Sequence, residues 1–173
     1  MMRLLALLSI LALAGCETNV LGHGCTEIGC GDALSLSFET ADGHWPDGDY
    51  RVELEFAGES EVCTFKLPDA LPTETAGAAQ VCEPSPRGFF SPKSTCTETR
   101  TKDAVSESCT PLPDQWTLAL YRDGTPETVS VRVTRDDQEV ASLSQTVDYR
   151  ENRPNGPDCE PVCRQSQIDV QVD

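Results

Sequence analysis

The sequence is poor in the residues that most catalytic and metal sites need. Its 173 residues include only two histidines, His23 and His44, and the motifs HExxH, GxSxG and SxxK are absent. Catalytic zinc is usually held by three protein ligands, and serine hydrolases place their nucleophile on a strained turn. Phosphate-binding loops of the type GxGxxG or GxxxxGK are missing as well. These absences argue against zinc catalysis, acyl transfer and nucleotide binding, and we expect no cofactor.

Cations and long apolar segments are also scarce. The chain has 13 lysines and arginines against 29 aspartates and glutamates, a formal net charge of −16. A field of this sign repels nucleic acid, so we expect no nucleic-acid partner. The one long apolar run, Leu4–Leu13, is well short of the roughly 20 residues that a membrane-spanning helix needs. It is therefore too short to remain as a transmembrane anchor.

The N-terminus contains the three parts of an export signal. Arg3 supplies a cation, Leu4–Leu13 is the apolar run, and small residues precede Cys16. The tetrapeptide at 13–16, LAGC, closely resembles the lipobox of bacterial lipoproteins. The resemblance implies cleavage before Cys16, acylation of its sulfur, and a lipid anchor in the cell envelope, with the outer membrane favoured over the inner. The alternative is an ordinary secretory signal that has a cysteine nearby.

This interpretation divides the chain into three parts. Residues 1–15 are a signal peptide, residues 16–24 are the lipidated cysteine and a short tether, and residues 25–173 are a single domain. Cleavage removes one cation, so the mature net charge is 12 − 29 = −17. About 158 residues are enough for one domain with a sizeable core.

Nine cysteines are an odd number for an exported protein. Lipid on Cys16 leaves eight, namely Cys25, Cys30, Cys63, Cys82, Cys96, Cys109, Cys159 and Cys163. None of them lies in a CxxC pair, so structural disulfides in an oxidising compartment are favoured over a metal site. Many connectivities remain open. We predict local pairing, as Cys25–Cys30, Cys63–Cys82, Cys96–Cys109 and Cys159–Cys163.

Beyond the tether, apolar residues alternate with polar ones, which is the period of half-buried strands. The clearest segments are Leu34–Phe38, Tyr50–Phe56, Cys63–Leu67, Trp116–Leu120, Val129–Val133 and Ile168–Val172. Seven to nine short strands without a helical stripe predict an all-β fold, an antiparallel, immunoglobulin-like β-sandwich stapled by disulfides. The segment 47–54, DGDYRVEL, resembles a strand of immunoglobulin-like and transthyretin-like modules. Segments 45–50 and 154–159 resemble parts of cysteine-rich envelope lipoproteins of Gram-negative bacteria, a resemblance that implies no activity.

The stretch from about 67 to 114 interrupts the alternation. It is rich in proline and contains three cysteines, so we expect a stapled insertion with short edge strands near 81–82 and 95–101. Within it, Arg87, Phe89 and Phe90 form a candidate partner contact, since arginine and aromatic residues are enriched in interface hot spots. The alternative is that Phe89 or Phe90 fills the core beneath the loop.

Calcium is the most plausible inorganic ligand. Asp42, Asp47 and Asp49 cluster in one predicted turn, and Asp136 and Asp137 lie in another. Ca²⁺ prefers oxygen ligands on irregular loops, but the EF-hand spacing is not met. Aspartate is also common in turns because its side chain hydrogen-bonds the local backbone.

Three functions remain open. The leading hypothesis is a non-catalytic binding or structural module that is held at the membrane by lipid on Cys16, with an envelope protein or a glycan as partner. The second is an accessory subunit of an envelope secretion, adhesion or assembly complex. The third is a carbohydrate-active enzyme that uses scattered carboxylates. Glu53 and Glu55 share a strand face, but their register predicts a solvated surface.

Overall fold

The computed structural model describes residue 25 and residues 27–72, 77–102 and 104–173. The signal peptide, Cys16 and the tether lie outside these residues, so they stay predictions. No helix within these ranges is long and apolar enough to cross a membrane.

Ten β-strands form the regular structure of the described residues. They are β1 (Ala33–Thr40), β2 (Gly48–Phe56), β3 (Glu59–Leu67), β4 (Ala79–Cys82), β5 (Arg87–Arg100), β6 (Val105–Asp123), β7 (Thr128–Arg135), β8 (Gln138–Thr146), β9 (Arg150–Asn152) and β10 (Cys163–Val172). Every segment with clear apolar alternation in the sequence lies in one of these strands.

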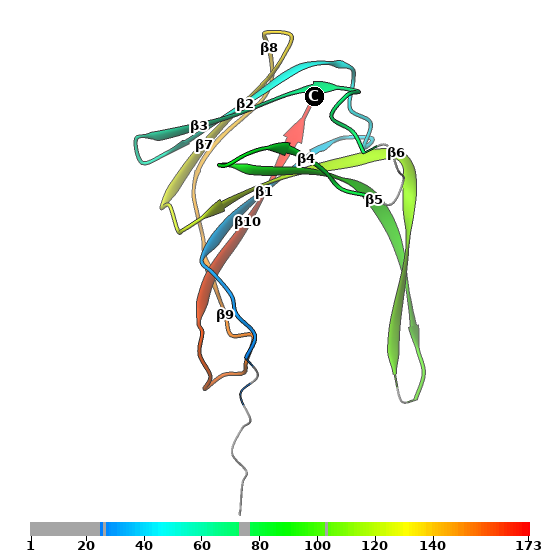
Figure 1. The fold of residues 1–173 in the computed structure, drawn as a ribbon, viewed down its shortest axis with the longest axis vertical. Coiled ribbons are helices and arrows are strands. Elements are labelled where there is room, and N and C mark those ends of the chain that lie inside the picture. The colour runs from blue at the N-terminus through cyan, green and yellow to red at the C-terminus, as the bar shows by residue number, and fades with distance from the viewer. Residues whose placement is uncertain (1–24, 26, 73–76, 103) are drawn as a thin grey trace, which may run out of the picture.

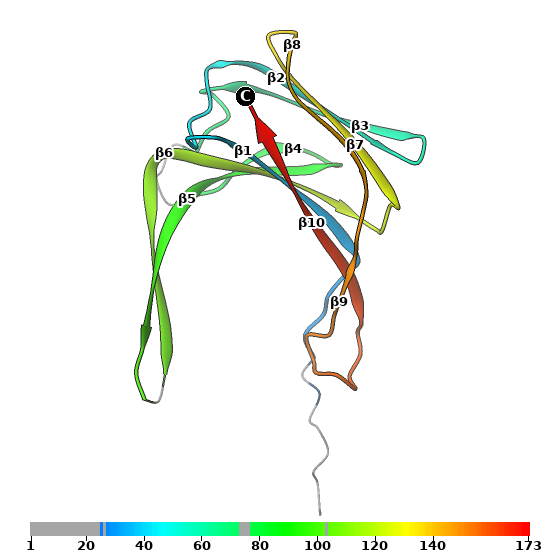
Figure 2. The same cartoon turned by 180° about the vertical axis from the view of Figure 1, so that it is seen from behind.

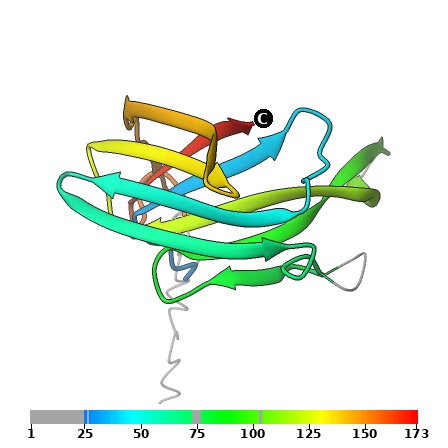
Figure 3. The same ribbon diagram turned by 90° about the horizontal axis from the view of Figure 1, so that it is seen from above.

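The strands form two sheets (Figure 1). One has six strands in the order β4-β5-β6-β1-β10-β9, and the other has four in the order β3-β2-β7-β8. Neighbouring strands are antiparallel except β1 and β10, which are parallel. From above, the four-stranded sheet lies over the six-stranded sheet (Figure 3). The prediction of an all-β, sandwich-like and disulfide-bonded fold is confirmed, with ten strands instead of seven to nine.

The alternating sequence places one face of each sheet in a shared core. In β1, Leu34, Leu36 and Phe38 are buried, while the residues between them are partly exposed. The alternate residues of β2 from Tyr50 to Phe56 are buried in the same way. Successive side chains on a strand point to opposite faces, so a period of two gives each sheet one apolar face.

An aromatic cluster joins the two sheets. Tyr50 and Phe65 from the four-stranded sheet stack at 5.1 Å, and Phe90 from the other sheet packs nearly perpendicular to Trp45 at 5.2 Å. The Trp45 Nε1–H donates to the Trp116 carbonyl at 3.0 Å, and the Tyr50 hydroxyl donates to the carbonyl of the residue that follows Trp45, at 2.9 Å. Burial raises the pKa of Tyr50. The apolar rings are therefore buried without leaving these polar atoms unpaired.

The local disulfide prediction is wrong at the two ends of the domain. Cys25 bonds to Cys159, and Cys30 bonds to Cys163, so the predicted pairs Cys25–Cys30 and Cys159–Cys163 do not form. The reason is the parallel pairing of β1 with β10, because it places the segment before β1 beside the segment before β10. The other two bridges, Cys63–Cys82 and Cys96–Cys109, pair as predicted.

A buried asparagine reinforces this junction of the two chain ends. The Asn155 Oδ1 accepts a hydrogen bond from the backbone N–H of Ile28 at 2.9 Å. Its Nδ2 donates to the carbonyls of Ile28, at 3.0 Å, and Glu160, at 2.6 Å. One side chain thus fixes the segment before β1 and the loop before β10.

The stretch of about 67–114 is largely part of the six-stranded sheet rather than a loop with short edge strands. It contains β4, β5 and the start of β6, and β5 pairs with β6 from Arg87↔Tyr121 to Arg100↔Val105. The register shifts between Pro92 and Ser94. Proline has no N–H for the ladder, so Pro92 of β5, with Pro111 and Pro113 of β6, marks an irregularity in a long hairpin, while the earlier prolines lie in the connections before β5.

Beyond that irregularity, β5 and β6 leave the body as an arm. Ser94–Arg100 and residues 105–110 are exposed throughout, and the Cys96–Cys109 bridge links directly paired positions. The arm and the β9–β10 end of the molecule extend to the same side of the body, which gives an arch (Figures 1 and 2).

Arg122 connects the two sheets at the opposite end of β6 from the arm. It forms ion pairs with Glu61 and, at 2.8 Å, with Glu59, both in β3. Its guanidinium carbon also lies 4.3 Å from the centroid of the Phe56 ring. The side chains of Arg122 and Glu61 are only 19% and 16% exposed. Removing one partner of such a pair leaves the other charge poorly solvated.

Tryptic digestion of the unreduced protein tests the connectivity. The sequence has no lysine or arginine between Arg3 and Arg51, and only Arg153, which precedes Pro154, between Arg150 and Arg164. The peptide ending at Arg51 should therefore be recovered joined to residues 151–164, and reduction should separate them in the mass spectrum. Two unlinked peptides, each with an internal bridge, would instead restore the local pairing.

Replacing Arg122 tests the connection between the sheets. Arg122→Ala should lower the free energy of unfolding by about 2–4 kcal/mol, because it leaves Glu61 without its counter-charge. Arg132→Ala is the matched control, since Arg132 pairs with Glu139 on an exposed face and its loss should matter much less. Urea unfolding followed by tryptophan fluorescence measures both. Equal losses in the two variants would show that the Arg122 pair has no special role.

Candidate functional site

The outer faces of both sheets carry ion pairs, but the part of the six-stranded sheet where β1 pairs with β10 has few charges. On the four-stranded sheet, charged side chains pair with each other, with Arg51 Nε 2.7 Å from Glu53 and Arg132 Nε 2.8 Å from Glu139. On the six-stranded sheet, the outward positions of β1 align Ser35 with Gln167 of β10. The middle of this second face is therefore built largely from small and amide side chains.

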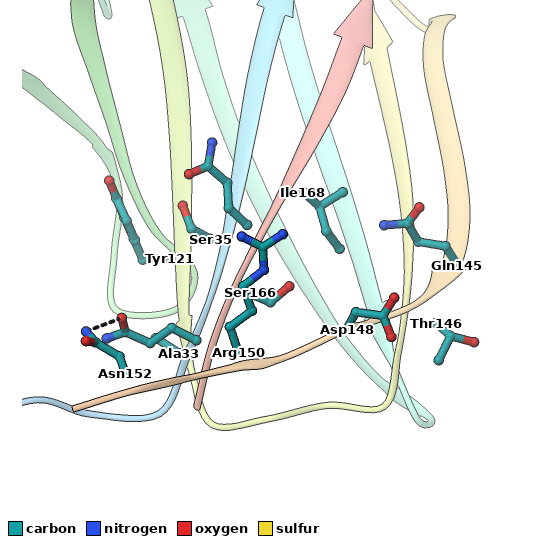
Figure 4. Close-up of a pocket in the computed structure, with 12 residues that line it drawn as sticks. Ala33, Ser35, Tyr121, Gln145, Thr146, Asp148, Arg150, Asn152, Ser166 and Ile168 are labelled. Atoms are coloured by element: carbon teal, nitrogen blue, oxygen red, sulfur yellow. Dashed lines mark hydrogen bonds between the residues drawn. The ribbon is translucent and has the colours of Figure 1, made fainter. Parts of the chain in front are cut away.

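A hollow of about 870 Å³ adjoins this part of the face and also reaches Ser166 and Ile168, on the other side of β10. Its walls come from β1, β6, β9 and β10, from the end of β8, and from the connection between β8 and β9. Figure 4 shows its side chains gathered around β10. The hollow exists where the chain crosses from one sheet to the other, between Thr146 at the end of β8 and Arg150 at the start of β9.

The lining is dominated by groups that both donate and accept hydrogen bonds. Four are amides, namely Gln145, Asn152, Gln165 and Gln167. Four carry hydroxyls, namely Ser35, Tyr121, Thr146 and Ser166. The charged members are Asp148 and Arg150, and Ala33 and Ile168 complete the walls. The lining thus carries one charge of each sign.

Two of the amides are held in place by the fold. The Asn152 Nδ2 donates to the Gln165 Oε1 at 3.1 Å, and the Gln165 Nε2 donates to the Gly31 carbonyl at 3.2 Å. The Asn152 Oδ1 is left to accept from another donor. Among the described residues, the side chains of Gln145, Asp148 and Arg150 make no hydrogen bond or ion pair. The hollow therefore combines fixed and unengaged polar groups.

Tyr121 provides the aromatic surface of the hollow. It is 39% exposed and is the one aromatic residue among the exposed large hydrophobic residues of the described chain. Its ring packs edge-on against Phe89 with 6.2 Å between centroids. Phe89 is partly exposed on the neighbouring strand β5, so the two rings lie on the same outer face of the sheet.

The three residues of the predicted partner contact are separated by the fold. Phe90 is fully buried in the aromatic cluster, which is the core alternative that the sequence left open. Arg87 and Phe89 face outward, and Arg87 pairs with Asp123 at 2.8 Å. A contact surface is thus available only through Arg87 and Phe89, beside Tyr121.

The candidate calcium ligands are not brought together. Among the described residues, only Cys96, Glu107 and Cys109 have ligand atoms close enough to form a metal-binding group, and their two sulfurs share a disulfide. The Asp42 carboxylate instead accepts a hydrogen bond from the His44 backbone at 2.9 Å, which lowers the pKa of Asp42. The Asp136 carboxylate likewise accepts a hydrogen bond from the Asp49 backbone N–H at 2.9 Å, and Asp47 is not part of any ligand group among the described residues. Turn formation accounts for these aspartates.

Glu53 and Glu55 line a smaller hollow of about 360 Å³ on the four-stranded sheet. Glu53 is engaged in ion pairs with Arg51, at 2.7 Å, and Arg132, at 3.7 Å. Glycosidases need a free acid and a second carboxylate on either side of the scissile bond. The surroundings of Glu53 are instead those of an ion-paired sheet surface.

The sequence did not identify Tyr121, Gln145, Asn152 or Gln165 as site residues. They come from four strands, and the β8–β9 crossover and the parallel β1–β10 pairing bring them together. One signal was present in the sequence, because Gln165, Gln167 and Gln171 recur at alternate positions of the last strand. Exposed strand faces usually carry charged residues that keep the protein soluble. Repeated amides on such a face indicate instead a polar surface with hydrogen-bonding groups.

Comparisons with known proteins found no matching family model, no matching curated protein and no matching solved structure.

Proposed function

We propose that this protein is a lipid-anchored component of the bacterial cell envelope whose domain binds a ligand without transforming it. The distribution of the nine cysteines carries the proposal. Eight form the four disulfides, and Cys16, within the lipobox-like tetrapeptide, is the one left over. Disulfides persist outside the cytoplasm, and acylation accounts for the odd cysteine.

The position of the first disulfide suits an anchored domain. Cys25 bonds to Cys159, so the polypeptide that arrives from Cys16 meets a covalent junction at the β9–β10 end of the domain. A tether from Cys16 to Cys25 reaches at most roughly 30 Å. The domain would therefore stay close to the membrane, with its β9–β10 end and the arm directed to the same side (Figure 1).

The chemistry of the hollow favours binding over catalysis. Its lining contains one carboxylate, Asp148, whereas glycoside hydrolysis uses two. His44, the one histidine among the described residues, lies in the turn between β1 and β2 and not in the hollow. The eight cysteines of the domain are in disulfides and do not act as thiolate nucleophiles.

An immunoglobulin-like classification belongs to the same proposal. It is supported by the facing sheets, by the Cys63–Cys82 bridge between β3 of one sheet and β4 of the other, and by the buried Trp45.

The arm favours the second candidate, an accessory subunit of an envelope complex. Its residues from Ser94 to Arg100 are all exposed and contribute nothing to the core, and an isolated two-stranded ribbon is marginally stable. The chain nevertheless keeps the arm and crosslinks it through Cys96 and Cys109. A partner that grips the arm would account for its length.

Replacing Cys16 tests the anchor. The native protein purified from membranes should have the mass of residues 16–173 plus a diacylglyceryl group, and it should enter the detergent phase on Triton X-114 partitioning. Cys16→Ser should leave the protein in the aqueous phase, because the acyl chains supply its membrane affinity. The double variant Cys96→Ser/Cys109→Ser is the control and should remain acylated. A wild-type protein of unmodified mass would refute the anchor.

Shortening the arm tests the accessory-subunit candidate. Ser94 and Pro111 are paired, so a two-residue Asn-Gly turn can join them with little change to the body. If the protein is a complex subunit, the wild-type protein should co-purify with a stoichiometric partner and the shortened protein should lose it while melting at a similar temperature. A wild-type protein that purifies alone as a monomer would count against this candidate.

A further inference from the structure

Charge is balanced within the hollow although the chain is strongly acidic. The lining has one acid, Asp148, and one cation, Arg150, in a protein with a net charge of −16. An anionic ligand would need surplus cations, and a cationic ligand would be attracted more strongly by the acidic remainder of the surface. A lining without net charge is complementary to an uncharged ligand.

The polar groups of the hollow match a ligand that is rich in hydroxyls. An amide side chain both donates and accepts hydrogen bonds, and so does each hydroxyl of a sugar. Gln145 and Arg150 are unengaged within the described part of the chain, and the Asn152 Oδ1 is oriented by the bond from its own Nδ2 to Gln165. Adjacent sugar hydroxyls can be paired by such groups without burying an unsatisfied atom.

Tyr121 supplies the apolar contact that hydrogen bonds alone do not give. A pyranose ring presents C–H groups on its face and hydroxyls around its edge, so its face can lie on an aromatic ring. Phe89 fixes the Tyr121 ring from the side, at 6.2 Å between centroids. A rigid tyrosine offers a large contact area and loses little conformational entropy on binding.

An extended peptide added to the edge of β10 is the main rival. β10 borders the hollow, but its first residues, Cys163–Gln165, already pair with β9. At its other end, the N–H of Asp173 donates to the Val140 carbonyl of β8 at 3.0 Å. Strand addition gains affinity from a row of free main-chain groups, which on this edge is confined to Ser166–Val172, and the test below separates this occupant from a sugar.

We propose that the hollow binds a neutral oligosaccharide. Tyr121 stacks on one sugar ring, Asn152 and Arg150 hydrogen-bond hydroxyls on the same face, and Gln145 contacts a part of the oligosaccharide that passes the edge of β10. This inference names the ligand class of the proposed binding function, on which it rests for the role of the domain. The site itself depends only on the geometry of the described residues.

Isothermal titration calorimetry of the exported full-length protein tests the site. The probes are maltohexaose, cellohexaose and chitohexaose, with hexagalacturonate as the anionic counterpart. At least one neutral probe should bind with a Kd of about 1 mM or tighter, and hexagalacturonate should bind more weakly. Tyr121→Ala should weaken binding about tenfold or more, equivalent to about 1.4 kcal/mol. Tyr121→Phe keeps the ring and should bind within a few fold of the wild type.

Val62→Ala is the matched control, because Val62 is 42% exposed on the other sheet. It should bind as the wild type does, and melting temperatures show that every variant is folded. The inference is overturned if no neutral probe binds at about 1 mM, if Tyr121→Ala binds undiminished, or if an extended peptide displaces the bound sugar by pairing with β10. Sugar binding by a protein with an unmodified Cys16 would refute the anchor alone, and an acylated protein that binds no sugar would refute the site alone.

Discussion

The parallel pairing of β1 with β10 is the constraint on which the rest of the structure depends. Its register runs from Ala33↔Gln165 to Thr40↔Val172 and joins the two ends of the domain inside the six-stranded sheet. Bringing together segments so distant in sequence costs chain entropy before any contact forms. The two bridges that span 134 and 133 residues lie at the start of this pairing. Long closed loops are where a covalent link restricts the unfolded chain most.

The same pairing creates the hollow that we propose as the binding site. It aligns the outward residues of β1 with those of β10, so Ser35 and Gln167 are neighbours on one face. β6 pairs with the other side of β1 and places Tyr121 beside Ser35. The short strand β9 then brings Asn152 against Gln165. A hydroxyl, an amide and an aromatic ring from distant parts of the chain thus meet because one strand pair is central to the sheet.

The strands and the core could be predicted from the sequence because they depend on local alternation. The pattern of Leu34, Leu36 and Phe38 needs no knowledge of the partner strand to predict a buried face. The bridges of Cys25 and Cys30, and the gathering of Tyr121 with Gln145, depend on which strands become neighbours. Alternation within a strand carries no information on which strands will be its neighbours. The prolines of 67–114 predicted a loop-like insertion, which is wrong for a related reason. In sequence, a proline that removes one ladder bond from a long hairpin cannot be distinguished from a proline in a loop.

The exposed surface around Tyr121 connects the proposed site with the proposed anchor. The four-stranded sheet uses paired charges such as Arg51 and Glu53, which keep an exposed sheet soluble at little cost. The six-stranded sheet has ion pairs of its own, Arg87–Asp123 and Lys93–Glu39, and it also exposes Tyr121, which the proposed ligand recognition would explain. A single small, neutral sugar site binds weakly, because hydrogen bonds to hydroxyls replace equivalent bonds to water. Many copies held on one membrane would bind a repeating polymer far more tightly than one copy, since each further contact is intramolecular. The proposed membrane anchor and the proposed neutral site are therefore mutually consistent.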